Sequence, residues 1–442
     1  MIRSVFPSVV LAIVGASAGA GCGGAVGPGG APAAPTQSAQ PLPAPTAGPG
    51  DTPATTAPEP SALPPPAAAE NAKPSVQVTP PSPEGNPFVG AHFYIDPSFV
   101  AEVESSIKES PADAALLKKV QAYPTAVWLS SIKAAGTVSK TLDNALAQQK
   151  KEGQPVVTVF AVYDLPDRDC AAVASNGELG TAKGGEKRYA KEFIDKIAAS
   201  FKAHPKQRIV AIVEPDSLAN VATNLKQYPK CAAAEQAYRH SIAYAIKALA
   251  MPNVSLYLDA AHAGWLGWKN NREKIAKIFS EVLAEAGGVD KIRGFATNVS
   301  NYDTLTPGDL RNLDPTDPAK DELDYVKILD ESLTEAGMVG KGFIVDTSRN
   351  GRAGIRTKSG SWCNVKGAGL GERPQASPAP LLDAYYWIKP PGEADGGSDP
   401  AKPGFDENCG PKSPDAEQGG PPAGGWFSKY FVELAKNANP PL

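Results

Sequence analysis

Short apolar runs alternate with longer stretches of helical character from about residue 83 to the C-terminus. The apolar runs are roughly four to eight residues long and often β-branched, which is typical of buried strands. They predict strands over residues 126–129, 155–162, 209–213, 254–259, 294–297, 342–346 and 385–389. The stretches between them predict helices over residues 98–110, 140–151, 187–203, 232–249, 271–286, 321–336 and 426–437.

This alternation within one long unit predicts an α/β fold in a single domain, residues 83–442. Strands that alternate with helices are typical of parallel sheets, because each helix returns the chain to the same edge. We interpret the pattern as a parallel (β/α) barrel. The periodicity alone is also compatible with an open sheet.

The stretch Ile209–Asn220, IVAIVEPDSLAN, shows where one strand should end. Pro215 lacks a backbone N–H and cannot continue a strand ladder, so pairing should stop beside it. Asp216 or Ser217 would then cap a following helix. A carboxylate just past the carboxyl end of a buried strand is where α/β barrels place catalytic groups. The alternative is that Asp216 serves only the turn or the cap.

Other predicted strands also end in charged side chains. In a closed barrel these ends converge on one face, so their carboxylates should meet there. The acidic residues that follow the runs at 155–162, 209–213 and 254–259 are Asp164, Asp167 and Asp169, then Asp216, then Asp259. The later runs are followed by Asp346 and Arg349, and by Lys389, Glu393 and Asp395.

Aromatic residues lie between these acids, namely Tyr94, Trp128, Tyr163, Trp265, Trp268 and Trp362. Sugar rings stack on indole faces, and cleavage of a glycosidic bond needs one protonated and one ionised carboxyl group. The combination indicates a sugar-polymer substrate. Any single Trp could instead belong to the core, but Trp265 and Trp268 flank Gly267 in a predicted loop, which favours exposure of at least one.

The N-terminus has the pattern of an export signal, residues 1–22. Arg3 precedes a short apolar segment, residues 9–14, which is too short to span a bilayer. Cys22 follows small residues, where a bacterial lipoprotein signal places its lipidated cysteine, although Gly19 stands where leucine is usual. We therefore expect a protein that is secreted or anchored at the outer cell envelope through a lipid on Cys22. Plain secretion with cleavage near this site is the alternative.

Residues 23–82 consist mainly of Pro, Ala, Gly, Thr and Ser. Such a segment cannot bury enough apolar surface to fold, so we predict a disordered linker. It would tether the domain at 83–442 to the cell envelope, or simply trail from it, rather than join two folded domains.

Composition narrows the classes of partner. The chain has 442 residues and a formal net charge of −4, without a long basic run. Nucleic-acid binding needs concentrated Lys and Arg, so we expect no nucleic-acid partner. The four histidines are scattered, and no Cys/His cluster has metal-ligand spacing. We expect neither a metal nor another cofactor.

Four cysteines remain when Cys22 is set aside, Cys170, Cys231, Cys363 and Cys409. An even number near loop segments predicts two disulfides, which suits an oxidising compartment. Three pairings are possible, and this count does not choose among them. The alternative is four unpaired cysteines in a cytosolic protein.

Several long strings resemble glycoside hydrolase family 6, a family of inverting cellulases with a distorted, seven-stranded barrel. They are VYDLPDRDCAAVASNG, VEPDSLAN, YLDAAHAGWLGW, ATNVSNY, DTSRNGR, WCNVKGAGLGERP and KPPGEADG. The resemblance runs from Asn86 to the C-terminal NANP at Asn437. It implies a distorted parallel (β/α) barrel of about seven strands, forming a single catalytic domain.

The resemblance also implies catalytic roles. Asp216 would donate a proton to the leaving oxygen, and Asp169 would keep the pKa of that donor high and assist the base. Like charges close together cannot both ionise easily, so one pKa should rise. Tyr163 and Ser175 would shape the distorted sugar and hold the attacking water. Either a water chain from Ser175 toward Asp169 or direct action of Asp395 would supply the base.

Substrate contacts follow from the same resemblance. Trp128, Trp265 and Trp362 match sugar-stacking positions. Asp395 would pair with Arg349 and Lys389. The full set of expected substrate-binding residues is Trp128, His262, Trp265, Trp268, Asn301, Trp362, Lys389, Glu393 and Arg349. The cysteines would pair as Cys170–Cys231 and Cys363–Cys409. Ser130 is a departure, because family members often carry Asp there.

We therefore expect a monomeric enzyme that cleaves cellulose or another β-1,4-glucan with inversion. Two long loops, one after Cys170 and one over residues 389–426, favour an enclosed cleft and cellobiose release from chain ends. The alternatives are an endo-β-1,4-glucanase with an open cleft and, more distantly, a carbohydrate-binding protein without activity.

Overall fold

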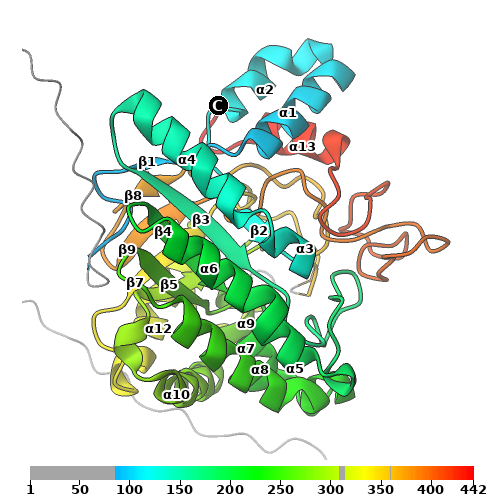
Figure 1. Ribbon diagram of the computed structural model, residues 1–442. Helices are drawn as coiled ribbons and strands as arrows, with labels where there is room; N and C mark the ends of the chain where they lie inside the picture. The colour runs from blue at the N-terminus through cyan, green and yellow to red at the C-terminus, as the bar shows by residue number, and fades with distance from the viewer. Residues whose placement is uncertain (1–84, 308–313, 359) are drawn as a thin grey trace, which may run out of the picture. The chain divides into compact units, whose positions relative to one another are not determined.

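The computed structural model describes residues 85–307, 314–358 and 360–442, which lie in one compact unit (Figure 1). The predicted signal, the linker and Cys22 fall outside the described residues. No helix in the described part of the chain is both long enough and apolar enough to cross a membrane.

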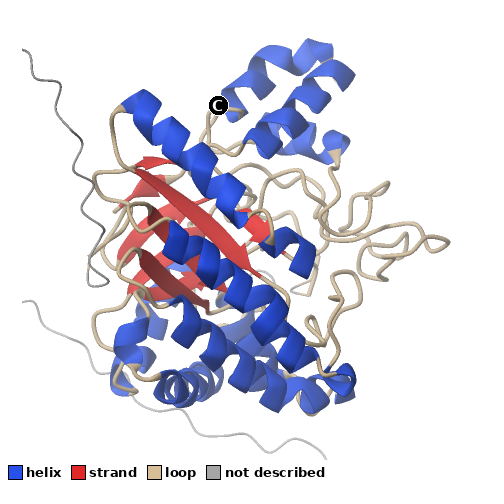
Figure 2. Cartoon of the chain, in the orientation of Figure 1, coloured by secondary structure: helices blue, strands red, loops and turns tan. Residues whose placement is uncertain are grey.

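The described region is built on one nine-stranded sheet in the order β1-β3-β4-β5-β6-β7-β9-β8, with β2 beside β3. Figure 2 shows the strands in red with helices beside them. Every pair is parallel except β8 with β9. The strands are β1 (His92–Phe93), β2 (Val127–Leu129), β3 (Val156–Val162), β4 (Arg208–Val213), β5 (Val254–Asp259), β6 (Gly294–Thr297), β7 (Gly342–Asp346), β8 (Gln375–Ala376) and β9 (Leu382–Tyr386).

The register aligns the carboxyl ends of neighbouring strands. Val162 at the end of β3 lies opposite Val213 at the end of β4, and Thr297 of β6 lies opposite Val345 of β7. The sheet curls, and the Ala126 amide donates to the Trp387 carbonyl at 3.1 Å, which joins the entry to β2 with the exit from β9. The predicted distorted parallel barrel is confirmed.

The strands are buried on both faces, which explains why they read as continuous apolar runs. In β3, Val157 and Val159 point into the barrel interior, whereas Phe160 and Val162 pack against the surrounding helices. Helix α8 shows the matching pattern, because Tyr238, Ile242, Ile246 and Leu249 recur every three or four residues and are buried.

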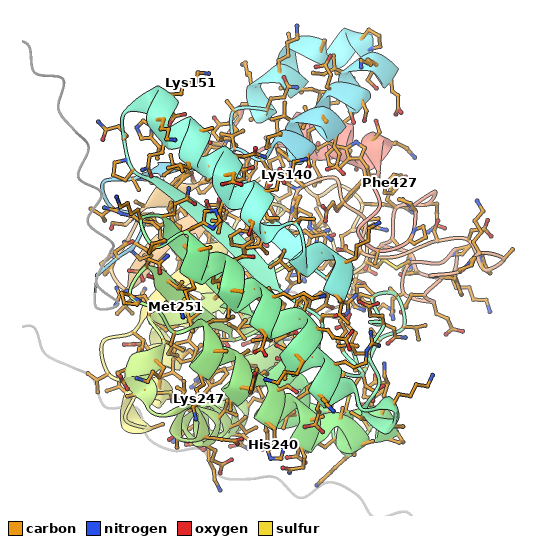
Figure 3. The ribbon with its side chains drawn as sticks, in the orientation of Figure 1. Lys140, Lys151, His240, Lys247, Met251 and Phe427 are labelled. Carbon is orange, nitrogen blue, oxygen red and sulfur yellow. A yellow bond between two sulfur atoms is a disulfide. The ribbon has the colours of Figure 1, made fainter. Side chains whose placement is uncertain are left out.

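Helices cover the outer face of the curled sheet, among them α4 (Val138–Glu152), α6 (Asp195–Ala203), α8 (Pro229–Leu249), α10 (Lys269–Ala286) and α12 (Glu322–Glu335) (Figure 1). Helices α1 (Pro97–Glu109), α2 (Ala114–Val120) and α13 (Ser428–Lys436) pack on one another in a separate cluster. The short helices are α3 (Ile132–Ala135), α5 (Gly185–Arg188), α7 (Ser217–Thr223) and α9 (Ala263–Leu266). The outward faces of the covering helices are polar, as Lys140 and Lys151 on α4 and His240 and Lys247 on α8 show (Figure 3).

Most predicted elements are present within one to three residues of their expected ends, with two differences. The helix expected over 187–203 is interrupted by a π-helical turn at Tyr189–Ile194 between α5 and α6. The last strand, expected over 385–389, is instead Leu382–Tyr386. The amides of Ile388 and Lys389 donate to the buried Asp346 carboxylate at 3.3 and 3.0 Å, so this segment leaves the sheet.

Candidate active site

A cleft of about 620 Å³ opens at the carboxyl ends of the strands. Its lining contains most residues expected to act on substrate, namely Trp128, Tyr163, Asp169, Ser175, Asp216, His262, Trp265, Asn301, Trp362, Lys389, Glu393 and Asp395. Volumes of this order are typical of ligand sites. The convergence of strand ends expected from the sequence therefore takes place.

Two expected residues, Trp268 and Arg349, do not line this cleft. Trp268 precedes α10, and its indole N–H donates to the Thr316 hydroxyl at 3.4 Å. Arg349 is fully buried and donates to both carboxylate oxygens of Asp395 at 2.9 Å. Arg349 therefore acts on the cleft through Asp395.

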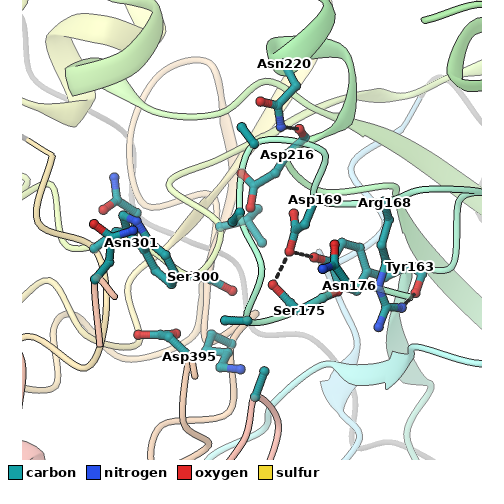
Figure 4. Close-up of a pocket in the computed structure, with 18 of the residues that line it drawn as sticks. Tyr163, Arg168, Asp169, Ser175, Asn176, Asp216, Asn220, Ser300, Asn301 and Asp395 are labelled. Atoms are coloured by element: carbon teal, nitrogen blue, oxygen red, sulfur yellow. Dashed lines mark hydrogen bonds between the residues drawn. The ribbon is translucent and has the colours of Figure 1, made fainter. Parts of the chain in front are cut away.

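The backbone presents Asp216 to the cleft. Glu214 and Asp216 both have positive φ, 51° and 60°, which is uncommon outside glycine and concentrates at functional sites. The expected side-chain cap on α7 is wrong, because neither Asp216 nor Ser217 caps the helix and the Ser217 hydroxyl donates to the Glu214 carbonyl. The Asp216 carboxylate instead lies among the acids of the cleft (Figure 4).

The pKa of Asp216 is raised well above its ordinary value. Burial is the largest cause, and the negative charges of Asp259, Asp169 and Asp395 add to it in that order. The expected contribution of Asp169 to this raised pKa is present, and burial and Asp259 contribute more. Asp259 accepts the Asp216 amide at 3.0 Å, and burial raises the pKa of Asp259 itself to about 6.

Asp169 receives two hydroxyl groups on one oxygen. The Tyr163 hydroxyl donates to its Oδ2 at 2.6 Å, and the Ser175 hydroxyl donates to the same atom (Figure 4). The Arg168 guanidinium donates to the Ser175 carbonyl at 2.8 Å and the Ser130 carbonyl at 2.7 Å, and it lies 4.4 Å from the Tyr163 ring centre. Arg168 thus holds the Ser175 loop against the strand ends, and residue 130 contributes through its backbone.

Both carboxylate oxygens of Asp395 accept hydrogen bonds. Besides Arg349, the Tyr302 hydroxyl donates to it at 2.9 Å and the Asn364 amide donates at 2.8 Å. Its expected pairing with Arg349 is present. Lys389 pairs instead with Glu393, at 3.5 Å, and lies 5.4 Å from the ring centre of Trp128.

Two indoles in the cleft, Trp128 and Trp265, are anchored at their N–H groups. Trp128 donates to the Ile388 carbonyl and Trp265 donates to the Thr223 hydroxyl, each at 2.8 Å. An indole fixed at its edge can present its face to a sugar ring without losing further freedom on binding.

Two segments, residues 168–180 and 390–425, meet at the cleft. We call them the roof segments. Asp406 accepts the amides of Val173 and Ala174 at 3.0 and 3.1 Å. The disulfides are Cys170–Cys231 and Cys363–Cys409, so the pairing implied by the resemblance is present.

Further residues line the cleft that the sequence reasoning did not assign to substrate binding, namely Ser130, Arg168, Asn176, Asn220, Asn224, Tyr228, Ser300, Ser361 and Asn408. Asn220 and Asn224 carried a usable signal, because they follow Asp216 by four and eight residues and share one face of α7. Asn224 is the C-cap residue of α7, and Tyr228 is the N-cap residue of α8, the next helix in the chain.

Comparisons with known proteins agree with this geometry. The model of Glycosyl hydrolases family 6 matches residues 88–438. Exoglucanase 3 of Agaricus bisporus is 42% identical over 363 residues, covering 81% of this chain and 80% of that protein. The 1,4-beta-D-glucan cellobiohydrolase C of Emericella nidulans is 40% identical over 368 residues, with 80% and 79% covered.

Solved structures give the same result. The catalytic core domain of the cellobiohydrolase Cel6A from Chaetomium thermophilum is 40% identical with a TM-score of 0.77, over 81% of this chain and 99% of that one. A family 6 enzyme from Coprinopsis cinerea, CcCel6C, is 39% identical with a TM-score of 0.77, over the same shares. Because one family model spans nearly all of the described region and relatives at about 40% identity cover four fifths of the chain, the protein belongs to glycosyl hydrolases family 6.

Proposed function

We propose that this protein hydrolyses the β-1,4-glucosidic bonds of cellulose with inversion and releases cellobiose from chain ends. The observation that carries the proposal is Asp216, a buried acid with a raised pKa that shares a cleft with Asp169, Ser175 and anchored indoles. The names of relatives, exoglucanase and cellobiohydrolase, support the substrate and the product.

In this mechanism Asp216 stays protonated and gives its proton to the glycosidic oxygen as the bond to the anomeric carbon breaks. A water molecule attacks the anomeric carbon from the opposite ring face. Its proton passes along the Ser175 hydroxyl toward Asp169, which that hydroxyl contacts. Each turnover leaves Asp216 ionised and Asp169 protonated, and exchange with solvent restores both.

The hydrogen bonds of Asp395 favour this route over direct action of that residue. Asp395 already accepts Arg349 at both oxygens and the Tyr302 hydroxyl and the Asn364 amide at Oδ2, so these donors occupy the positions that an attacking water molecule would need. Asp395 would instead serve as a fixed negative charge that stabilises the positive charge developing on the sugar.

The chain-end mode rests on the roof segments. Their contact through Asp406, and their presence in the cleft lining through Ala174, Asn408 and Gly424, favour an enclosed path for a glucan chain. An enclosed path is reached most easily from a chain end, whereas an open cleft would admit internal bonds.

Hydrolysis of cellohexaose followed by proton NMR tests the proposal. We expect cellobiose as the main product, with the new reducing end appearing first as the α-anomer. Asp216→Asn is the control and should form almost none. If the β-anomer appears first, the enzyme does not invert. A broad mixture of products would favour an endoglucanase. Binding of cellohexaose without hydrolysis would indicate a carbohydrate-binding protein without activity.

We further propose that the enzyme is exported as a monomer and that residues 23–82 tether it to the envelope through a lipid on Cys22. The support is the pattern of residues 1–22. The wild type should enter the detergent phase on phase separation, and Cys22→Ala should move it to the aqueous phase. A wild type already in the aqueous phase would indicate plain secretion.

A further inference from the structure

We propose that Asp303, held by Arg356, is a positioning residue that fixes His262 so that its Nε2 meets a hydroxyl of the sugar on the leaving-group side of the cleft. The inference rests on the proposed function and extends it to residues remote from the reacting bond.

The contact between His262 and Asp303 sets the orientation of the imidazole. His262 Nδ1 lies 2.7 Å from Asp303 Oδ2, and the Gly264 amide donates to the same oxygen at 2.8 Å. Asp303 is completely buried, whereas the His262 side chain is 19% exposed and lines the cleft. With Nδ1 donating to a carboxylate, Nε2 is the ring nitrogen left for a ligand.

Arg356 keeps Asp303 charged. Its guanidinium donates to Asp303 Oδ1 at 2.6 Å, so each carboxylate oxygen serves one partner side chain. Burial opposes ionisation of Asp303, but the charges of His262 and Arg356 hold the pKa of its carboxyl well below its usual range. An ionised Asp303 is a strong acceptor for the Nδ1–H of His262.

The backbone of Asp303 is also fixed. Its amide donates to Asn298 Oδ1 at 3.2 Å, and its carbonyl accepts the side-chain amides of Asn298 and Asn350, both at 3.0 Å. These contacts tie the segment after β6 to the segment after β7. Asp303 therefore offers His262 a rigid support.

The neighbours of His262 identify its ligand as a sugar ring. The imidazole and the Trp265 indole lie 6.0 Å apart at 60°, and both line the cleft. A sugar stacked on Trp265 brings its hydroxyl edge toward His262. Strand order places Asp216, after β4, between Tyr163, after β3, and His262, after β5, so His262 lies on the side away from Tyr163.

Without Asp303 the imidazole can turn about χ2 and exchange its two nitrogens, because this torsion has two broad wells. We expect Asp303→Ala to lower kcat/KM for cellotetraose about tenfold, the usual scale for loss of one well-placed hydrogen bond, mainly through KM. Activity on 2,4-dinitrophenyl β-cellobioside should stay nearly unchanged, because its leaving group is not a sugar. In a His262→Ala background, Asp303→Ala should have little further effect.

The matched control is Asp383→Ala. Asp383 is also buried and pairs with Arg293 at 2.7 Å and Tyr257 at 2.6 Å, but it lies at the start of β9, at the opposite end of the sheet from the cleft. It should not change the ratio of the two activities. Equal losses on both substrates in Asp303→Ala, or additive losses in the double variant, would overturn the inference.

A second measurement does not depend on activity. The chain has four histidines, so ring ¹⁵N spectra can be assigned by comparison with His262→Gln. We expect His262 to carry a proton on Nδ1, and Asp303→Asn, which keeps the shape of the side chain, to change that resonance. A neutral His262 protonated only on Nε2 would refute the pairing. A wild type that hydrolyses neither substrate would instead refute the proposed function.

Discussion

At the scale of single residues, the chemistry depends on how the surroundings of Asp216 keep its proton in place. Burial disfavours the ionised carboxylate, and the neighbouring acids disfavour it further. Asp169 accepts the hydroxyls of Tyr163 and Ser175 on one oxygen, and the Ser175 hydroxyl connects it to the proposed path of the water's proton. Two carboxyl groups of the same type thus take different roles because their environments differ.

Replacement of the donor should separate protonation from the rest of catalysis. We expect Asp216→Asn to lower kcat on cellotetraose by roughly two to four powers of ten, because an amide has no proton to give. The loss should be much smaller on 2,4-dinitrophenyl β-cellobioside, whose leaving group needs little protonation. Steady-state kinetics on both substrates provide the measurement, and equal losses on the two would argue against Asp216 as the donor.

The pH profile should report the influence of Asp259 on the donor. Activity requires protonated Asp216, so it falls as pH rises through the pKa of that group. Asp259→Asn removes the largest charge contribution to the raised pKa and keeps an oxygen for the Asp216 amide. The basic limb of kcat should therefore move to lower pH, whereas Asp383→Asn should leave it in place. If the basic limb of Asp259→Asn stays in place or moves to higher pH, Asp259 does not raise the pKa of the donor.

At the scale of elements, the roof segments decide which bonds are reachable. Each contains one cysteine of a disulfide, and the bonded cysteines are 61 and 46 positions apart in the sequence. Closing loops of this size stabilises the fold by about 4 kcal/mol each in the chain-entropy model. The disulfides thus anchor the segments, but the contact between them depends on the Asp406 carboxylate and two amides.

We expect Asp406→Ala to let the roof segments part and expose internal bonds of a glucan. The viscosity of soluble carboxymethyl-cellulose should then fall faster per bond cut than with the wild type. Asp399→Ala is the matched control, because Asp399 lies in the same segment and pairs only locally, with Lys402 at 3.5 Å. If the wild type already lowers viscosity as steeply as Asp406→Ala, the cleft is open and the enzyme acts as an endoglucanase.

At the scale of the whole molecule, buried acids make folding stability depend on pH. Burial is the main cause that raises the pKa of Glu102 and Asp164 to about 7 and of Asp259 and Asp317 to about 6. An acid whose pKa is higher in the folded state binds its proton more tightly there than in the unfolded chain. Its contribution to stability is present at low pH and is lost as pH rises through the folded-state pKa.

The free energy of unfolding should therefore fall between about pH 4 and pH 7 as these groups ionise. Asp164 is the best test, because its side chain is fully buried and its Oδ2 has no partner among the described residues. Asp164→Asn cannot ionise, so urea unfolding at pH 5 and pH 8 should show a smaller difference than in the wild type. An identical difference would show that Asp164 does not titrate in this range.

Much of this protein follows from local patterns in its sequence. Strands β5, β6 and β7 have the bounds that their apolar runs predict, because a strand buried on both faces leaves a continuous apolar run. Asp169, Asp216 and Asp395, which follow β3, β4 and β9, meet in one cleft, because parallel strands bring their carboxyl ends together. The expectation is wrong for Asp164, Asp167, Asp259 and Asp346, which do not line this cleft. The long sequence motifs also indicated the correct family and the correct pairing of the four cysteines.

Only the tertiary structure decided features that join distant parts of the chain. The final strand ends early because the Lys389 amide donates to Asp346, which lies 43 residues before Lys389 in the sequence. Trp268 lies outside the cleft lining, where its indole N–H donates to Thr316, and Arg349 is buried behind Asp395, to which it donates. Asp259 raises the pKa of Asp216 more than Asp169 does, and Asp303 supports His262. Both effects depend on distances and burial that are set by which strands become neighbours. The periodicity of the sequence therefore does not show them.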